Sequence, residues 1–151
     1  MNELKKCGLD DELVAFIETG RPVLAICLGM QLLMEWSKEY TYSEGLGVIK
    51  GGVISIIENH SEIERIKLPN IGWLPVKELR GLTRLELNGQ FYFVHSFMIS
   101  PADSSLVVGG AKFKQIDIPA VLQRQNLVGC QFHPEKSGHD GLKFIESFLG
   151  L

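Results

Sequence analysis

The sequence has no long apolar run and little excess charge, and both absences exclude classes of protein. No stretch approaches the ~20 consecutive apolar residues that a membrane-spanning helix needs. The N-terminal segment MNELKKCGLDDELVAF lacks the apolar run and the small-residue cleavage site of a secretory signal. The formal net charge is −3, and scattered Lys and Arg form no basic face for nucleic acid. We therefore expect neither a membrane nor a nucleic-acid partner.

Cysteine is also scarce, and its spacing excludes a disulfide framework. The chain contains three cysteines, Cys7, Cys27 and Cys130, an odd number spread widely over the sequence. Small disulfide-stabilised proteins instead carry even numbers of cysteines at regular spacings. We therefore expect a reducing, cytoplasmic location.

The length and the hydrophobic pattern predict one α/β domain over residues 1–151. Apolar residues at helical spacing between Leu4 and Ile17 predict a helix, and the apolar run 22–26 predicts a buried strand. A helical pattern over 31–40 follows. Further along the chain we expect strands at 91–94, 106–113, 118–123 and 127–132 and an amphipathic helix at 141–149.

One dipeptide gives a strong turn signal in the β-rich middle of the chain. Asn88-Gly89 tolerates the positive φ angles of a type I′ turn, and it precedes the aromatic run Phe91-Tyr92-Phe93-Val94. We therefore expect a tight hairpin at these two residues.

The stretch RPVLAICLGMQLLMEW places Cys27 between a buried strand and a helix. A nucleophile on so sharp a turn needs small residues two positions away on either side, and Ala25 and Gly29 meet that need. A helix N-terminus at the turn would favour the thiolate over the thiol. Gln31 lies one helical turn further on, where its amide could bind a polar substrate. Cys27 is equally compatible with a small, buried and inert core residue.

A thiol nucleophile requires a base, and the base requires a group that orients it. His133 follows the last expected strand, in the segment CQFHPEK. Residues two apart in extended backbone point to the same side, so Glu135 could accept from one ring nitrogen while the other faces Cys27. Pro134 between them fixes φ. His60, in the polar segment ENHSEIER, is expected to be solvent-exposed.

A structural histidine beside a turn and a metal site are the alternatives for this segment. Cys130, His133, Glu135 and His139 supply sulfur, nitrogen and oxygen ligands within one short stretch. The stretch contains no C-x-x-C pair, however, and Glu135 cannot easily serve both a metal and a histidine. We therefore expect no metal.

Together these residues resemble the class I, or triad, glutamine amidotransferases, and among them the glutaminase subunits of imidazole glycerol phosphate synthases. The combination of the cysteine turn with QFHPEKS is specific to that family. The resemblance implies a flavodoxin-like α/β fold with a mixed central sheet and flanking helices. It extends from near Gly8 to the C-terminus through PVLAICLGMQLL, GLGVIKGGV, LPNIGWLPV, FYFVHSF and GCQFHPEKSGHDGLKFIESFL.

The resemblance implies a catalytic triad and an acyl-transfer reaction. Cys27 would attack the side-chain carbonyl of L-glutamine, His133 would act as general base and then as acid, and Glu135 would orient the histidine. The products would be glutamate and ammonia, formed through a γ-glutamyl thioester. Neither a metal nor an organic cofactor is implied.

The family pattern also implies which residues meet the substrate and the partner. Glu39 would bind the α-ammonium group of glutamine, and Trp73 and Lys136 would lie near the face that meets a (β/α)8-barrel cyclase. This heterodimer would use the ammonia to make imidazole glycerol phosphate and AICAR in histidine biosynthesis. The implied glutamine site consists of Gln31, Glu39, His95, Ser96 and Phe97.

The chain departs from the family pattern at its start and at single positions. Family members usually carry a preceding segment with further sheet strands and an oxyanion strand, so N-terminal strands are expected to be missing here. Leu74 stands where asparagine is usual, and Phe97 where tyrosine is usual. Two alternatives therefore stay open: a paralogous amidotransferase subunit for surface-sugar amidation, and a catalytically inactive partner-binding fragment. An unrelated cysteine hydrolase is a third, but it would not require Gln31, Glu39 and the VHSF segment.

Overall fold

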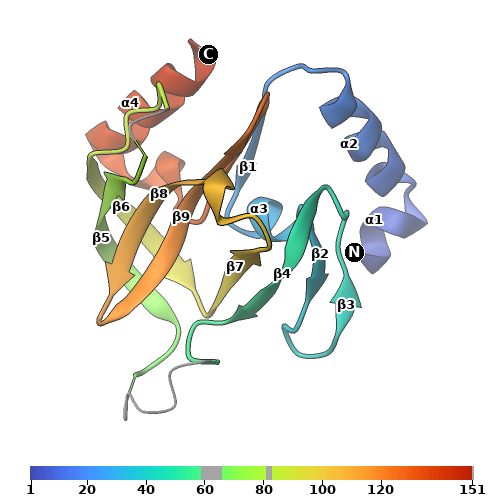
Figure 1. Ribbon diagram of the computed structural model, residues 1–151, viewed down its shortest axis with the longest axis horizontal. Helices are drawn as coiled ribbons and strands as arrows, with labels where there is room; N and C mark the ends of the chain where they lie inside the picture. The colour runs from blue at the N-terminus through green and yellow to red at the C-terminus, as the bar shows by residue number, and fades with distance from the viewer. Residues whose placement is uncertain (59–65, 81–82, 151) are drawn as a thin grey trace.

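Two β-sheets form the framework of the computed structural model, which describes residues 1–58, 66–80 and 83–150 (Figure 1). The larger sheet has the strand order β1-β10-β9-β8-β5-β6, and the smaller has the order β3-β2-β4-β7. The larger sheet consists of β1 Val23–Ile26, β5 Asn70–Glu78, β6 Gly89–His95, β8 Val107–Phe113, β9 Ile116–Arg124 and β10 Leu127–Cys130. The smaller consists of β2 Met34–Ser37, β3 Ser43–Glu44, β4 Ile49–Ser55 and β7 Phe97–Pro101.

Both sheets are mixed, and one parallel pairing positions the candidate site. β1 runs parallel to β10, with Ile26 opposite Cys130. Parallel strands have their carboxyl ends at the same edge, where α/β proteins collect functional groups. Cys27 and the residues that follow Cys130 therefore lie together, although Cys27 and Gln131 are 104 positions apart in sequence.

The helices flank the sheets, as expected for this α/β fold. They are α1 Asn2–Lys6, α2 Leu9–Glu18, α3 Leu28–Leu32 and α4 Gly138–Leu149, with short 3-10 helices η1 Ser104–Leu106 and η2 Pro134–Lys136. Gly8 divides the expected first helix because its φ of 66° is left-handed and cannot continue an α-helix. α4 and the α1–α2 pair lie at opposite sides of the molecule (Figure 1). None of the described helices is long and apolar enough to cross a membrane.

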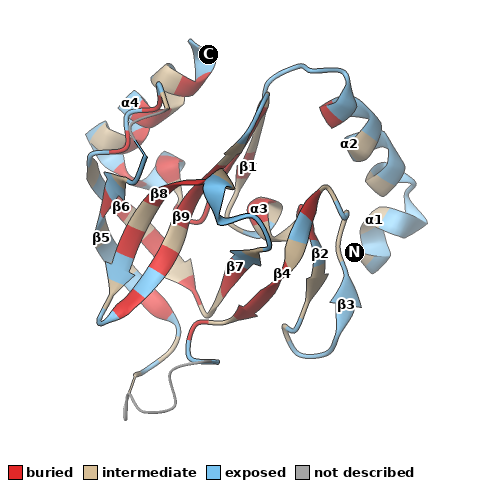
Figure 2. Ribbon diagram, in the orientation of Figure 1, coloured by how far each residue is buried: buried red, intermediate tan, exposed pale blue. Residues whose placement is uncertain are grey.

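Buried residues concentrate on the strands, whereas α1 and α2 are largely exposed (Figure 2). An aromatic cluster joins β6 and α4 to the end of β10. The ring of Phe132 lies 4.1 Å from that of Phe91 and 5.1 Å from that of Phe144, measured between centroids. Phe132 is fully buried and immediately precedes His133, so this cluster anchors the backbone from which the histidine projects.

The helix expected over 31–40 is wrong beyond Leu32. Met34–Ser37 instead forms β2, which pairs in parallel with β4, with Trp36 opposite Gly52. A Cβ on Gly52 would lie 2.3 Å from the Trp36 ring, so the missing side chain allows the indole to lie on the neighbouring strand. Strand pairing and this packing override the local helical pattern.

The tight hairpin expected at Asn88-Gly89 is also wrong. β5 and β6 do pair as antiparallel neighbours, but Val76 is opposite Gly89, so residues 77–88 intervene. Neither Asn88 nor Gly89 has a positive φ. Gly89 instead begins β6 against α4, where an added Cβ would lie 2.6 Å from Asp140 Oδ2. The later strands and the closing helix lie within a few residues of their predicted positions.

Candidate active site

Cys27 lies on a strained turn between β1 and α3. Its φ of 48° and ψ of −105° belong to a region that non-glycine residues rarely adopt. The Cys27 N–H donates to the Cys130 carbonyl at 2.7 Å, and the Cys27 carbonyl accepts from the Gln31 N–H at 3.2 Å. A Cβ added at Gly29 would lie 3.6 Å from the Ala25 Cβ, an ordinary contact, so these two small residues face each other across the turn without crowding. The predicted sharp turn is therefore present.

The surroundings of the sulfur favour the thiol. Burial is the largest influence and raises the pKa of Cys27, and the carboxylates of Glu135 and Glu39 raise that pKa further. The backbone N–H of Leu28 and the side chain of Gln131 act in the opposite direction. The expected preference for thiolate at the helix end is wrong, because a helix of five residues does not outweigh burial. A base must therefore remove the thiol proton.

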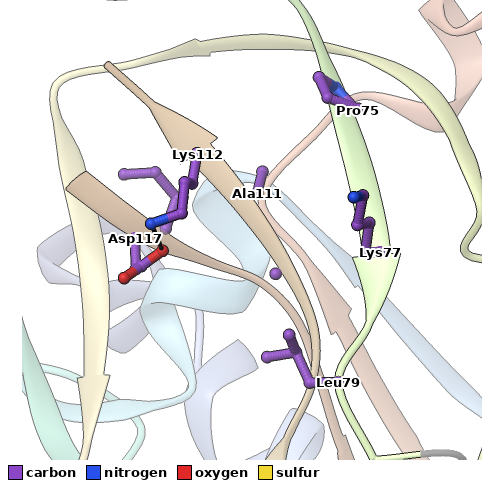
Figure 3. Close-up of a pocket in the computed structure, with 8 residues that line it drawn as sticks. Pro75, Lys77, Leu79, Ala111, Lys112 and Asp117 are labelled. Carbon is purple, nitrogen blue, oxygen red and sulfur yellow. Dashed lines mark ion pairs between the residues drawn. The ribbon is translucent and has the colours of Figure 1, made fainter. Parts of the chain in front are cut away.

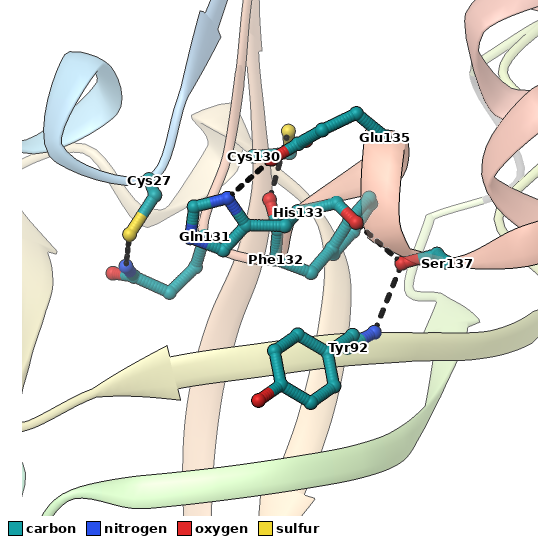
Figure 4. Close-up of polar contacts among 8 residues, drawn as sticks. All are labelled: Cys27, Tyr92, Cys130, Gln131, Phe132, His133, Glu135 and Ser137. Carbon is teal, nitrogen blue, oxygen red and sulfur yellow. Dashed lines mark hydrogen bonds and ion pairs between the residues drawn. The ribbon is translucent and has the colours of Figure 1, made fainter.

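The imidazole of His133 is held by contacts on both its ring and its backbone. Nδ1 lies 2.7 Å from Glu135 Oε1 (Figure 4). Because a carboxylate accepts hydrogen bonds, Nδ1 carries the shared proton, and Nε2 is the ring atom that remains for proton transfer. The His133 N–H donates to the Tyr92 carbonyl at 2.9 Å.

Ser137 is a buried residue that the sequence analysis did not single out. Its hydroxyl donates to the His133 carbonyl at 2.6 Å and accepts from the Tyr92 N–H at 2.9 Å (Figure 4). The serine thus ties the turn carrying His133 and Glu135 to β6. Its position in the QFHPEKS segment was the available signal, but its β6 partner is distant in sequence.

The parallel strands bring Cys27 and His133 into the same region (Figure 4). Among the hydrogen bonds of the described residues, the side-chain partner of the sulfur is Gln131 Nε2, at 3.6 Å, rather than His133. Catalytic hydrogen bonds are often long without substrate and shorten in the substrate complex. Proton transfer from Cys27 to His133 stays a prediction.

A small cavity opens beside the sulfur and collects every residue of the implied glutamine site. Its volume of about 160 Å³ is several times the ~30 Å³ share of one liquid water and smaller than the ~300–1,000 Å³ of drug-sized sites. This size suits a small polar metabolite. The glutamine-binding roles stay predictions. The lining residues are Cys27, Leu28, Gln31, Glu39, Val94, His95, Ser96 and Phe97.

Two side chains of this cavity share one carbonyl acceptor. The Phe97 carbonyl accepts from Gln31 Nε2 at 3.0 Å and from His95 Nδ1 at 2.8 Å. His95 Nε2 must then be unprotonated in the neutral ring, and it accepts from Asn70 Nδ2 at 3.0 Å. Burial lowers the pKa of His95 to about 4. His95 is therefore a neutral wall of the cavity, and Asn70, which the sequence analysis missed, fixes its tautomer.

We expect His95 to make the protein less stable as the pH falls from about 6.5 to about 4. An unfolded histidine binds a proton near pH 6.5, whereas the buried ring resists protonation until its pKa of about 4. The unfolded state therefore binds more protons in this window, and the free energy of unfolding should fall by about 3 kcal/mol. Urea unfolding near the two ends of this window should show that loss in the wild type. Equal losses in wild type and His95→Gln would contradict it.

The two residues expected at the partner interface lie around Tyr92. Trp73 is opposite Tyr92 in the β5–β6 pairing, with the ring centroids 6.0 Å apart, and it is 52% exposed. Lys136 is exposed on η2 and precedes Ser137, whose hydroxyl contacts the Tyr92 N–H. Trp73 and Lys136 are therefore connected through two residues, Tyr92 and Ser137. Their contact with a partner stays a prediction.

The residues considered as metal ligands do not converge. Across residues 1–58, 66–80 and 83–150, no group of three or more His, Cys, Asp or Glu side chains is arranged to hold a metal. The Cys130 thiol is buried and contacts the Phe132 carbonyl, and Glu135 contacts His133. His60, expected to be exposed, lies outside the described residues.

A larger cavity of about 510 Å³ shares no residue with the one beside Cys27 (Figure 3). Its charged residues are Lys77, Lys112 and Asp117, of which the last two form an ion pair at 2.9 Å. It contains neither a histidine nor a thiol, so its lining offers no nucleophile–base pair. The smaller cavity is the candidate active site. The lining of the larger cavity is Pro75, Lys77, Leu79, Gly110, Ala111, Lys112, Asp117 and Ile118.

Comparison with known families identifies the architecture around this site. The family model described as glutamine amidotransferase class-I matches residues 4–149. The chain belongs to the class I glutamine amidotransferases. The α/β fold with its mixed sheet and flanking helices, expected from the sequence, is confirmed by this match and by the structure.

Relatives of this amidotransferase chain include proteins named imidazole glycerol phosphate synthase subunit HisH. The one from Geobacillus thermodenitrificans is 37% identical over the whole chain, which spans 71% of that protein. The HisH 1 protein of Methanococcus maripaludis is 44% identical over 86% of the chain, an alignment that spans 62% of that protein. The resemblance to this branch of the amidotransferases is therefore confirmed.

Solved structures share the fold at low sequence identity. A crystal structure of a glutamine amidotransferase has a TM-score of 0.62 at 20% identity, and the match covers 98% of this chain and 71% of that one. A glutamine amidotransferase from Thermotoga maritima has a TM-score of 0.56 at 16% identity, covering 97% and 53%. These likenesses establish the fold.

Proposed function

We propose that the chain is the glutaminase subunit of an imidazole glycerol phosphate synthase and hydrolyses L-glutamine to glutamate and ammonia. The arrangement at the carboxyl ends of β1 and β10 carries this proposal. There the Cys27 thiol lines a small cavity that also holds the Glu39 carboxylate, and the contact between His133 and Glu135 orients an imidazole in the same region. The relatives named HisH support the same pathway.

In this proposal each group of the triad takes a defined step. His133 Nε2 takes the proton of the Cys27 thiol, and the sulfur forms a bond to the side-chain carbonyl carbon of glutamine. The carbon–nitrogen bond then breaks, and the proton on His133 passes to the departing ammonia. A water that gives its proton to His133 attacks the thioester, glutamate leaves, and the thiol is restored. Glu135 accepts from Nδ1 throughout and stabilises the imidazolium.

Glutamine would be held by charge and by one oriented amide. Glu39 lines the cavity and supplies a carboxylate for the α-ammonium group. Both N–H groups of the Gln31 amide are already donated, to Phe97 and Gln131, so its carbonyl oxygen is the group that would accept from the substrate.

The partner in this proposal is a cyclase subunit with a (β/α)8 barrel, which would receive the ammonia. The curated relatives are named as subunits of a synthase, which supports a heterodimer. Trp73 is an exposed aromatic side chain, a type enriched at protein interfaces, and Lys136 is an exposed basic one. We place the heterodimer in the cytoplasm because a reducing compartment keeps the Cys27 thiol reactive.

A thioester trap tests this proposal. The protein, mixed with a cyclase subunit, is incubated with glutamine and quenched in acid, and its peptides are analysed by mass spectrometry. We expect a glutamyl group on the peptide containing Cys27, together with glutamate release. The Cys7→Ser variant should behave like the wild type because Cys7 is an exposed residue of the α1–α2 connection.

Two other outcomes would replace the proposal. Turnover of esters or peptides without turnover of glutamine would indicate an unrelated cysteine hydrolase. Stable binding to the cyclase with neither thioester nor glutamate would indicate a catalytically inactive partner-binding chain.

A further inference from the structure

Gln131 is a buried amide in contact with the nucleophile. It follows β10 directly, has no exposed surface, and its backbone N–H donates to the Ala120 carbonyl at 2.9 Å. Its side-chain Nε2 lies 3.6 Å from Cys27 Sγ, and its Oε1 lies 3.2 Å from Gln31 Nε2. A fully buried glutamine costs free energy unless its amide is satisfied, so these two contacts explain how it is tolerated.

The orientation of the Gln131 amide follows from a series of hydrogen bonds that ends at the Phe97 carbonyl. The Phe97 carbonyl can only accept, so the Gln31 atom that faces it must be the amide nitrogen. That same nitrogen also faces Gln131, which must therefore present its oxygen. The nitrogen of Gln131 is then turned toward the sulfur. The Phe97 carbonyl in β7 thus sets the orientation of Gln131, so that an amide N–H of Gln131 points at the Cys27 sulfur.

We propose that Gln131 is a thiolate-stabilising residue of the glutaminase reaction and that a hydrogen bond from Gln31 fixes the orientation of its side-chain amide. When His133 removes the thiol proton, the charge that appears on Sγ is met by an N–H group that is already aimed at it. The donor requires no rearrangement, because the carbonyl of Phe97 fixes its direction before substrate arrives. This inference rests on the proposed glutaminase function but concerns the thiol itself.

The charged groups around Cys27 show why such a donor matters. Glu135 on η2 and Glu39 after β2 both act against a negative charge on the sulfur, and burial acts in the same direction. His133 must carry the thiol proton during catalysis, while the buried His95 in the same cavity stays neutral. Among the described side chains, Gln131 is the one that donates a hydrogen bond to Sγ.

The thiol reactivity of Cys27 tests the inference without glutamine or partner. The rate of alkylation by iodoacetamide is measured in a Cys7→Ser background from about pH 7 to about pH 11, because burial raises the pKa of Cys27 above that of an ordinary thiol. Cys130 is fully buried, and mass spectrometry of the peptides confirms the site of reaction. In Gln131→Met we expect the midpoint to rise by about one pH unit, with alkylation about tenfold slower below the midpoint.

A matched variant separates this effect from general loss of structure. Gln123→Met makes the same substitution on the neighbouring strand β9, where the amide accepts from the Thr83 hydroxyl and does not touch the sulfur. It should leave the midpoint unchanged. A folded Gln131→Met protein with the wild-type midpoint would overturn the proposal, as would an equal shift in Gln123→Met.

A second measurement uses protein that keeps Gln131, so the proposal can be tested even if Gln131→Met does not fold. The side-chain amide resonances of Gln131 in a nitrogen–proton NMR spectrum should move with the same midpoint as alkylation and should lose that transition in Cys27→Ser. Resonances that do not respond to thiol ionisation would overturn the proposal. Glutaminase activity is measured separately. Absence of the midpoint shift would contradict the role of Gln131, whereas absence of glutamine turnover would contradict the proposed function.

Discussion

Replacing Cys27 by alanine is expected to lower glutamate release by about 10⁴-fold or more, because no thioester can form without the sulfur. The cavity residues that would bind glutamine are untouched by this change. Glutamine binding, measured by calorimetry, should therefore stay close to that of the wild type. The measurement is steady-state glutamate release by the protein with its cyclase partner.

Two controls define what this loss means. Cys7→Ser removes an exposed thiol outside the cavity and should keep full activity. Thermal unfolding of Cys27→Ala should resemble the wild type, since alanine keeps the backbone of the turn. If Cys27→Ala retained more than a small fraction of the activity, the thioester mechanism would be wrong even though the family assignment would stand.

The second large effect is expected at Gly141, where α4 passes over the turn that carries His133 and Glu135. A Cβ at this position would lie 2.0 Å from the Pro134 carbonyl oxygen and 2.8 Å from the Ser137 Cβ. Backbone cannot yield as a flexible side chain does, so α4 must move away from η2 in Gly141→Ala. We expect the free energy of unfolding to fall by about 3 kcal/mol and the melting temperature by about 6–12 °C.

The displacement of α4 in Gly141→Ala should also disturb the position of the catalytic histidine. η2 includes Glu135, and Ser137 binds the His133 carbonyl, so a shifted α4 loosens the support of the imidazole. Gly150→Ala is the matched control, because a Cβ there meets its nearest atoms at 3.7 Å, an ordinary contact. Calorimetry should show little change in that variant. Equal melting temperatures for Gly141→Ala and Gly150→Ala would show that α4 accommodates the methyl group.

Sequence patterns predicted the features that depend on short spacings. The apolar run before Cys27, the small residues at Ala25 and Gly29, and the two-residue spacing of His133 and Glu135 each specify local geometry. The structure contains the corresponding turn and the contact between His133 Nδ1 and Glu135, although Pro134–Lys136 forms the 3-10 helix η2 rather than the expected extended backbone. Their catalytic roles rest on the proposed function.

Features set by distant partners were not predictable from those patterns. Met34–Ser37 has a helical pattern, yet it forms a strand because β4 lies beside it. Burial raises the pKa of Cys27, although a helix end alone would lower it. The orientation of Gln31 is set by Phe97, 66 positions away, and no local signal encodes that contact. Long-range packing therefore determines the electrostatics of the site.

The pairing of β1 with β10 has a consequence for the order of folding. Cys27 and Gln131 are separated by 104 positions, so the site requires the closure of a long loop, whose entropic cost must be met before its contacts form. During synthesis the nucleophile emerges well before β10 and His133, which lie much further along the sequence. Until then Cys27 lacks the burial, the amide donor and the base that the finished fold supplies. The nascent chain thus carries an ordinary thiol, and its special reactivity arises only when the two distant strands meet.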